Sequence, residues 1–162
     1  MKQKVGVIGL GIMGSAMSAN LLKDGFSVIG YDVVPECVEA LKTKGGIGAG
    51  SCKEVAAESD VVITSLPSVE ALQEVVSGEN GIPGGAKKGL VVIETSTLPL
   101  DAKQEAYDAL IKAGVELLDC PLSGSGVSLP TPAAAKKRVR IVNPSFTVLP
   151  APIITWGSSA WA

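Results

Sequence analysis

Residues 5–32 read VGVIGLGIMGSAMSANLLKDGFSVIGYD. The stretch begins with an apolar, mostly β-branched run, continues through glycines at positions 9, 11 and 14, and ends on the acid Asp32. The first run is typical of a strand buried on both faces of a parallel sheet, and helical spacing of apolar residues follows over about 12–23. The order of strand, glycine turn, helix and second strand predicts a βαβ unit that holds a dinucleotide.

Each glycine in this stretch has a physical role in such a unit. Gly9 permits the tight turn, Gly11 lets the backbone approach a pyrophosphate, and Gly14 lets the helix lie close to the strand. The free amides and the dipole of the helix N-terminus would then face the phosphates. A glycine-rich turn can also be only a turn, but the flanking elements favour a phosphate loop, whose candidate residues are Gly9, Leu10, Gly11, Ile12, Met13 and Gly14.

Asp32 lies 18 residues after Gly14, at the end of the second predicted strand. A carboxylate at this place accepts hydrogen bonds from the hydroxyls of an adenosine ribose and repels a 2′-phosphate. No arginine occurs in the adjoining segment YDVVPE to attract that phosphate. The sequence therefore predicts NAD as the cofactor, with NADP less favoured.

Strand and helix patterns continue to alternate after Asp32. Pro35 begins a helix, a short strand covers Ile47 to Ala49, and Ser51 with Glu54 forms a capping box. Further strands are expected at 61–65, 90–94 and 115–118, with helices between them whose inner faces carry Val69, Leu72, Val75 and Val76, then Leu110 and Ile111. This alternation predicts an α/β fold of Rossmann type, a doubly wound parallel sheet in a single domain.

Composition limits the function classes. The chain has 162 residues, about one domain, and its net charge of −2 argues against nucleic acid or an anionic membrane as the main partner. No apolar run is long enough for a membrane span and no signal pattern precedes the first strand, so we expect a cytoplasmic location. Three scattered cysteines predict neither a disulfide framework nor a metal site, and the absence of histidine excludes an imidazole base.

In a doubly wound sheet, ligands bind beyond the carboxyl ends of the strands. The loops at those ends are therefore the places to look for further binding residues. They contain Leu66-Pro67-Ser68, Thr95-Ser96-Thr97 and residues 119–126. Ser96 and Thr97 could equally be helix caps, and Pro67 could be only a strand terminator.

Four strings carry a resemblance to one family: GLGIMGSAMSANLLKDG, SLPS at 65–68, ETST at 94–97 and DCPLSGSG at 119–126. In this order they resemble the successive signatures of the β-hydroxyacid dehydrogenases, which include 3-hydroxyisobutyrate dehydrogenase, tartronate semialdehyde reductase, L-threonate dehydrogenase and, more distantly, 6-phosphogluconate dehydrogenase. The resemblance implies hydride transfer between a nicotinamide and a small hydroxy acid.

The resemblance also implies roles for individual residues. Asn20 matches an asparagine of the first helix, Leu66 and Pro67 match a pair that lies against the cofactor, and Thr97 matches a hydroxyl residue on the nicotinamide side. Ser123 and Gly124 match the segment that binds the substrate, while Ser125 replaces the family's usual second glycine. In the family a lysine on a later helix is the general acid or base, and a helical domain follows, through which members usually pair. No catalytic residue can be assigned in this chain, and a homo-oligomer is left open.

The likeness ends after Gly126, and the remaining residues differ in composition. Residues 1–127 carry ten lysines and sixteen acids, a charge of −6, whereas 128–162 carry a charge of +4 and half of the prolines. We expect residues 1–127 to form the NAD(P)-binding domain and residues 128–162 to be an irregular, Pro-rich basic tail, without a helical C-terminal domain. An out-of-frame ending or a truncated gene would produce such a change in composition. The alternative is a basic arm at 136–140, and neither Lys136 nor Lys137 has the family's helical spacing for the missing base.

Overall fold

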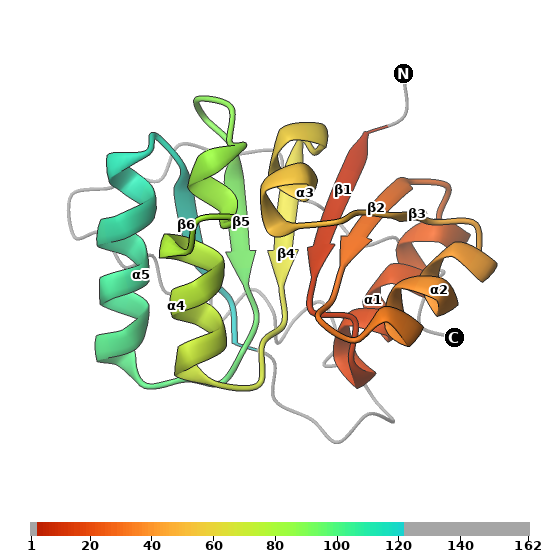
Figure 1. The fold of residues 1–162 in the computed structure, drawn as a ribbon, viewed down its shortest axis with the longest axis horizontal. Coiled ribbons are helices and arrows are strands. Elements are labelled where there is room, and N and C mark those ends of the chain that lie inside the picture. Colours follow the sequence, from red (N-terminus) through yellow and green to blue (C-terminus); the bar gives the residue numbers. More distant parts are fainter. Residues whose placement is uncertain (1–2, 122–162) are drawn as a thin grey trace.

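The computed structural model describes residues 3–121 of the chain. Ser123, Gly124 and the tail at 128–162 therefore lie outside the described residues. The elements alternate along the chain (Figure 1). Their bounds are β1 Lys4–Ile8, α1 Ile12–Lys23, β2 Ser27–Tyr31, α2 Pro35–Thr43, β3 Ile47–Gly48, α3 Cys52–Glu58, β4 Val61–Thr64, α4 Val69–Ser77, the 3₁₀ turn η1 Ile82–Gly84, β5 Val91–Glu94, α5 Leu100–Lys112 and β6 Glu116–Asp119.

The strands form one parallel sheet in the order β3-β2-β1-β4-β5-β6. Central β1 pairs with both β2 and β4, so that Val7 lies between Gly30 and Ile63. The chain winds outward from β1 in one direction and then, from β4, in the other. This is the strand order of a dinucleotide-binding sheet, with its crevice at the carboxyl ends of β1 and β4. The predicted α/β doubly wound fold is confirmed.

The helices cover the sheet from two sides and make two apolar cores. One core joins β1, β2 and β4 to α1 and α2, around Val7, Leu21 and Leu41. The other lies under α3, α4 and α5, around Val55, Leu72 and Leu110. Figure 1 shows α4 and α5 side by side, with the strands running down toward the edge where both helices begin. Within residues 3–121, every helix is too short or too polar to span a bilayer.

Two local predictions need correction. Ile111 was expected on the inner face of its helix, but its side chain is 47% exposed, because the inner stripe of α5 passes through Ala102, Ala106 and Leu110 instead. The capping box at α3 is shifted by one residue. Ser51 accepts a hydrogen bond from the Glu54 amide as expected, but the Glu54 carboxylate accepts from the amide of Gly50.

The three glycines of the first turn lie in different surroundings. Gly9 has a φ of +87°, where L residues are strained, and a side chain there would overlap the carbonyl of Ser65. A side chain at Gly14 would overlap the carbonyl oxygen of Gly9. A Cβ at Gly11 would meet no atom of residues 3–121 within 4 Å. Gly9 and Gly14 thus serve the fold itself, whereas Gly11 faces open space.

The contrast between Gly14 and Gly11 is testable by a single methyl group. We expect Gly14→Ala to lower the free energy of unfolding by about 1 to 3 kcal/mol, because α1 must move away from the turn. Gly11→Ala, the matched control, should lower it by at most about 1 kcal/mol, the usual cost of alanine at an N-cap. Urea unfolding followed by circular dichroism measures both. Equal losses in the two variants would contradict the assigned roles.

Candidate functional site

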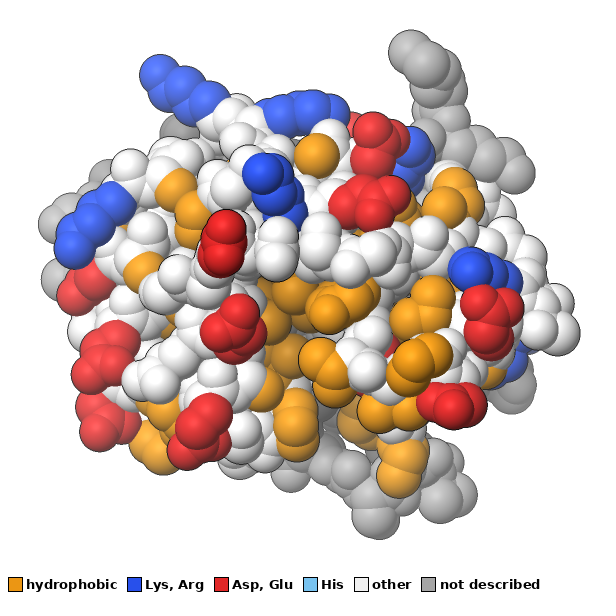
Figure 2. Space-filling view, in the orientation of Figure 1, with side chains coloured by type: hydrophobic (Ala, Val, Ile, Leu, Met, Phe, Trp, Pro, Cys, Tyr) orange, Lys and Arg blue, Asp and Glu red, His pale blue; other side chains and the backbone are white. Residues whose placement is uncertain are grey.

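The loops at the carboxyl ends of the strands gather at one edge of the sheet. The turn 9–14 follows β1, Asp32 follows β2, residues 65–68 follow β4 and residues 95–97 follow β5. In the view of Figure 2, apolar side chains gather in the middle of the molecule, between α4 and α2, and reach down to the edge where the strands end. The sequence-predicted site residues among those described are therefore brought to a common edge.

The N-terminus of α1 is open. Its N-cap is Gly11, no side chain caps the helix, and its first turn contains no acidic residue. By contrast, Ser51 caps α3 and Ser68 caps α4, each with a glutamate in the first turn. The first amides of a helix lack intrahelical acceptors, and the helix dipole adds partial positive charge there. The amides at Ile12, Met13 and Gly14 are suited to an anionic group.

Asp32 joins the end of β2 to the glycine turn at 9–14. Its Oδ2 accepts a hydrogen bond from the amide of Leu10 at 2.6 Å, and its Oδ1 accepts from the amide of Val34 at 2.9 Å. Sequence reasoning gave this carboxylate only a ligand role and missed the bond to the loop. Each carboxylate oxygen can accept more than one hydrogen bond, so the side chain, which is partly exposed, can still accept from ribose hydroxyls.

The loops after β4 and β5 are bonded to one another. The amide of Leu66 donates to Ser96 Oγ at 2.8 Å, and Thr95 Oγ1 donates to the carbonyl of Thr64 at 2.7 Å. Leu66 packs against the core under α3, α4 and α5, while Pro67 and Thr97 are exposed at the edge. Ser96 is thus an acceptor between two loops and not the cap of α5, whose N-cap is Pro99.

A buried group of charges lies beside these loops. Lys103 of α5 is 3% exposed, and its Nζ lies between Glu94 at the end of β5 and Asp119 at the end of β6, which are 1% and 6% exposed. The Nζ to Glu94 Oε2 distance is 2.8 Å, and Nζ also donates to Asp119 Oδ1 and, at 2.7 Å, to the carbonyl of Ser96. The ammonium therefore lies between two carboxylates and a backbone carbonyl oxygen.

Burial alone would lower the pKa of Lys103, because it penalises the charged form. The carboxylates of Asp119 and Glu94 outweigh that effect, so the pKa lies above its ordinary value. A general base must give up its proton near neutral pH. Lys103 is held in its charged form and is suited to binding neighbours rather than to moving protons.

Sequence reasoning did not single out Lys103. The spacing of the helix could have identified it. Positions 103, 106 and 110 share one face of a helix, so Lys103 lies in line with the apolar residues Ala106 and Leu110. A charged side chain within a buried stripe requires a buried partner. Glu94 and Asp119 could have been suggested as the partners, because Glu94 ends one predicted apolar strand and Asp119 directly follows the next.

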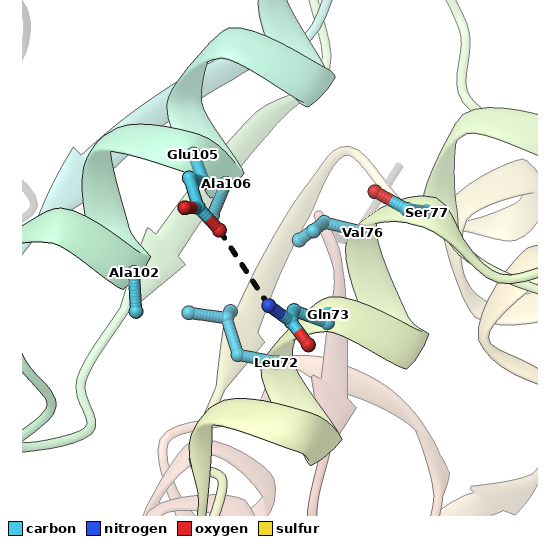
Figure 3. Close-up of a pocket in the computed structure, with 7 residues that line it drawn as sticks. All are labelled: Leu72, Gln73, Val76, Ser77, Ala102, Glu105 and Ala106. Carbon is cyan, nitrogen blue, oxygen red and sulfur yellow. Dashed lines mark hydrogen bonds between the residues drawn. The ribbon is translucent and has the colours of Figure 1, made fainter.

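Other features of the structure do not form a ligand site. A pocket of about 230 Å³ lies between α4 and α5, where Gln73 Nε2 contacts Glu105 Oε2 at 3.5 Å (Figure 3). It is smaller than the usual ligand pocket of roughly 300 to 1,000 Å³, and no predicted site residue lines it. In the part of the chain that the structure describes, no group of three or more His, Cys, Asp or Glu could hold a metal ion.

All three cysteines are free thiols. Burial raises the pKa of Cys52 to about 11. Burial, together with the charge of Asp119, also raises the pKa of Cys120. A thiol that stays protonated is a poor nucleophile, so Cys52 and Cys120 behave as small apolar side chains.

The ion group at Lys103 should dominate the stability of this edge. We expect Lys103→Met to lower the free energy of unfolding by about 3 to 5 kcal/mol, because two buried carboxylates lose their cation. Lys112→Met, on an exposed position of the same helix, should stay within about 0.5 kcal/mol of the native chain. Urea unfolding compares them, and similar values for both variants would show that the buried ion group contributes no net stability.

Known proteins of similar sequence and fold were found. The family model described as the NAD binding domain of 6-phosphogluconate dehydrogenase matches residues 4–135. The mitochondrial 3-hydroxyisobutyrate dehydrogenase of Mus musculus is 42% identical over 123 residues, which are 76% of this chain and 37% of that protein.

Among solved structures, 3-hydroxyisobutyrate dehydrogenase of Mycobacterium tuberculosis with L-serine has a TM-score of 0.72 and 32% identity, covering 78% of this chain and 42% of its own. Psf3 in complex with NADP+ and 2-OPP has a TM-score of 0.70 and 25% identity, covering 75% and 43%. The chain thus spans less than half the length of these relatives. The family model covers most of the chain, including the glycine turn and Asp32. The chain therefore belongs to the β-hydroxyacid dehydrogenase family, as an NAD-binding domain of the 6-phosphogluconate dehydrogenase type.

Proposed function

We propose that this chain binds NAD(H) across the carboxyl edge of its sheet, with the pyrophosphate at the N-terminus of α1. The observation that carries the proposal is the open space at Gly11 together with the uncapped first turn of α1. Gly9, Leu10, Gly11, Ile12, Met13 and Gly14 would surround the phosphates, and Asp32 would accept from the adenosine ribose. Leu66, Pro67 and Thr97 would lie along the nicotinamide half.

The preference for NAD over NADP is part of this proposal. It rests on the carboxylate of Asp32, whose negative charge would repel a 2′-phosphate. The bonds from Leu10 and Val34 orient that carboxylate at the end of β2. Psf3, a similar structure, is described in complex with NADP+, so the fold alone does not select NAD.

The proposed reaction is hydride transfer between the nicotinamide and a small hydroxy acid, of the 3-hydroxyisobutyrate dehydrogenase type, with Ser123 and Gly124 in the substrate segment. The relatives named for this activity support it. The second candidate is a dinucleotide-binding module without turnover. This second candidate is favoured by the state of Lys103, the buried lysine of the described edge. Two carboxylates hold it in its charged form, so it is not suited to act as a general base. Turnover of 3-hydroxyisobutyrate by the purified chain distinguishes the two.

The proposal also covers the partners and the cellular location of the chain. We propose no nucleic-acid or membrane partner because the net charge is −2, and a homo-oligomer stays open. Free thiols at all three cysteines suit a reducing compartment, of which we propose the cytoplasm. The mouse relative carries a mitochondrial name, so the matrix is the alternative. Imaging the tagged chain in its own cells separates them.

A bulky side chain at Gly11 tests the phosphate site. Gly11→Val should still fold, at a cost of about 1 kcal/mol for valine at an N-cap, because among the described residues no atom lies within 4 Å of an added Cβ. It should nevertheless abolish NADH binding by filling the place of the pyrophosphate. Gln104→Val, on an exposed position of α5, is the control for adding a β-branched residue to a helix. Titration followed by NADH fluorescence measures binding, and unchanged affinity in a folded Gly11→Val chain would rule out the proposed site.

Cofactor preference tests Asp32. We expect the native chain to bind NADH at least about tenfold more tightly than NADPH, a difference of about 1.4 kcal/mol. Asp32→Asn removes the charge and keeps one of the two acceptor oxygens, enough for the bond from the Leu10 amide but not for that from Val34 as well. Without the charge, NADPH should bind more tightly to this variant than to the native chain. Isothermal titration calorimetry with both cofactors gives the ratio. Tighter binding of NADPH than of NADH by the native chain would overturn the assignment.

A further inference from the structure

Three polar side chains form a buried row across the end of the sheet. Thr64 of β4, Glu94 of β5 and Asp119 of β6 are partners in the strand register. They follow Val62, Val92 and Leu117 by two residues on the same strands, so they lie on the face that α4 and α5 cover. All three are buried. The apolar core beneath α5 is therefore closed at its carboxyl end by a polar layer.

Lys103 joins this layer to the loops above it. Its Nζ donates to Asp119 and to the carbonyl of Ser96, and it forms an ion pair with Glu94 Oε2. Glu94 Oε1 in turn accepts from the amide of Ser96 at 2.8 Å, and Ser96 Oγ accepts from the amide of Leu66. A single ammonium group thus fixes Ser96 through two paths and reaches the loop after β4 through one more bond.

The connection ends on the residues proposed to lie along the nicotinamide half of the cofactor. In a sheet of this order the two halves of a dinucleotide lie on either side of the crevice between β1 and β4. The loops at 9–14 and Asp32 belong to one side. Leu66, Pro67 and Thr97 belong to the other, next to Ser96.

We propose that Lys103 is a positioning residue for the nicotinamide half of the bound dinucleotide, acting through Glu94, Asp119 and Ser96 on the loops that follow β4 and β5. The inference rests on the proposed function, because it assumes that NAD(H) binds at this edge. Packing alone does not require a buried charge here, since apolar side chains of similar volume often stabilise a protein as well. Glu94 Oε2 has no hydrogen-bond partner among the described residues, so Lys103 is what compensates its burial.

The test compares binding of NADH with binding of ADP-ribose, which lacks the nicotinamide. ADP-ribose reports on the adenosine side, so a general loss of structure would weaken both ligands, whereas displaced nicotinamide-side loops would weaken NADH alone. The variants are Ser96→Ala, which removes one acceptor and retains Lys103, and the triple change Glu94→Gln, Lys103→Met and Asp119→Asn, which removes all three charges together. Lys112→Met is the matched control on the same helix.

For the native chain we expect NADH to bind more tightly than ADP-ribose. Ser96→Ala should weaken NADH about tenfold, as loss of a hydrogen bond of ordinary strength does, with ADP-ribose changed less than about twofold. The triple variant should lose at least as much NADH affinity, and Lys112→Met should match the native chain for both ligands. If the triple variant does not fold, Ser96→Ala alone decides.

An unchanged ratio of NADH to ADP-ribose affinity in Ser96→Ala, or in a folded triple variant, would overturn the positioning role. Equal binding of the two ligands by the native chain would overturn it as well, while leaving the dinucleotide site intact. A native chain that binds neither ligand would instead overturn the proposed function, and the positioning role with it.

Discussion

Helix α1 can approach the turn after β1 only because position 14 has no side chain. A methyl group at Gly14 would overlap the carbonyl oxygen of Gly9, whose own backbone has a positive φ. This close approach directs the first amides of α1 toward the edge where the strands end. The crevice, the open space at Gly11 and the position of Asp32 beside Leu10 all depend on it.

The two sides of the crevice are organised by different physics. On the side of β1 and β2, backbone geometry shapes the proposed phosphate site, because the glycine turn and the lack of a side-chain cap leave the first amides of α1 without partners among residues 3–121. On the side of β4, β5 and β6, a buried cation between two carboxylates ties the loops together. Buried charges cost free energy unless they are well paired, so this second arrangement depends on the packing of α5 over the sheet.

Much of the fold was predictable from local pattern. The bounds of α1 and α2 agree with the prediction, because Pro35 begins one helix and the glycine turn precedes the other. Ile111 was misassigned because apolar spacing near the end of a helix fits two faces, and only the angle at which α5 packs on the sheet selects one. The roles of Ser123 and Gly124 remain predictions, since they lie outside the described residues.

By itself the sequence determined the βαβ order, the glycine turn and the alternation that gives a doubly wound sheet, since these depend on glycine positions and apolar periodicity within short segments. Tertiary structure decided the rest. Lys103 meets Glu94 and Asp119 only after β5 and β6 pair in register and α5 packs across them. Asp32 likewise reaches Leu10 only when β2 lies beside β1. Such contacts join residues far apart in the chain, and no local spacing specifies them.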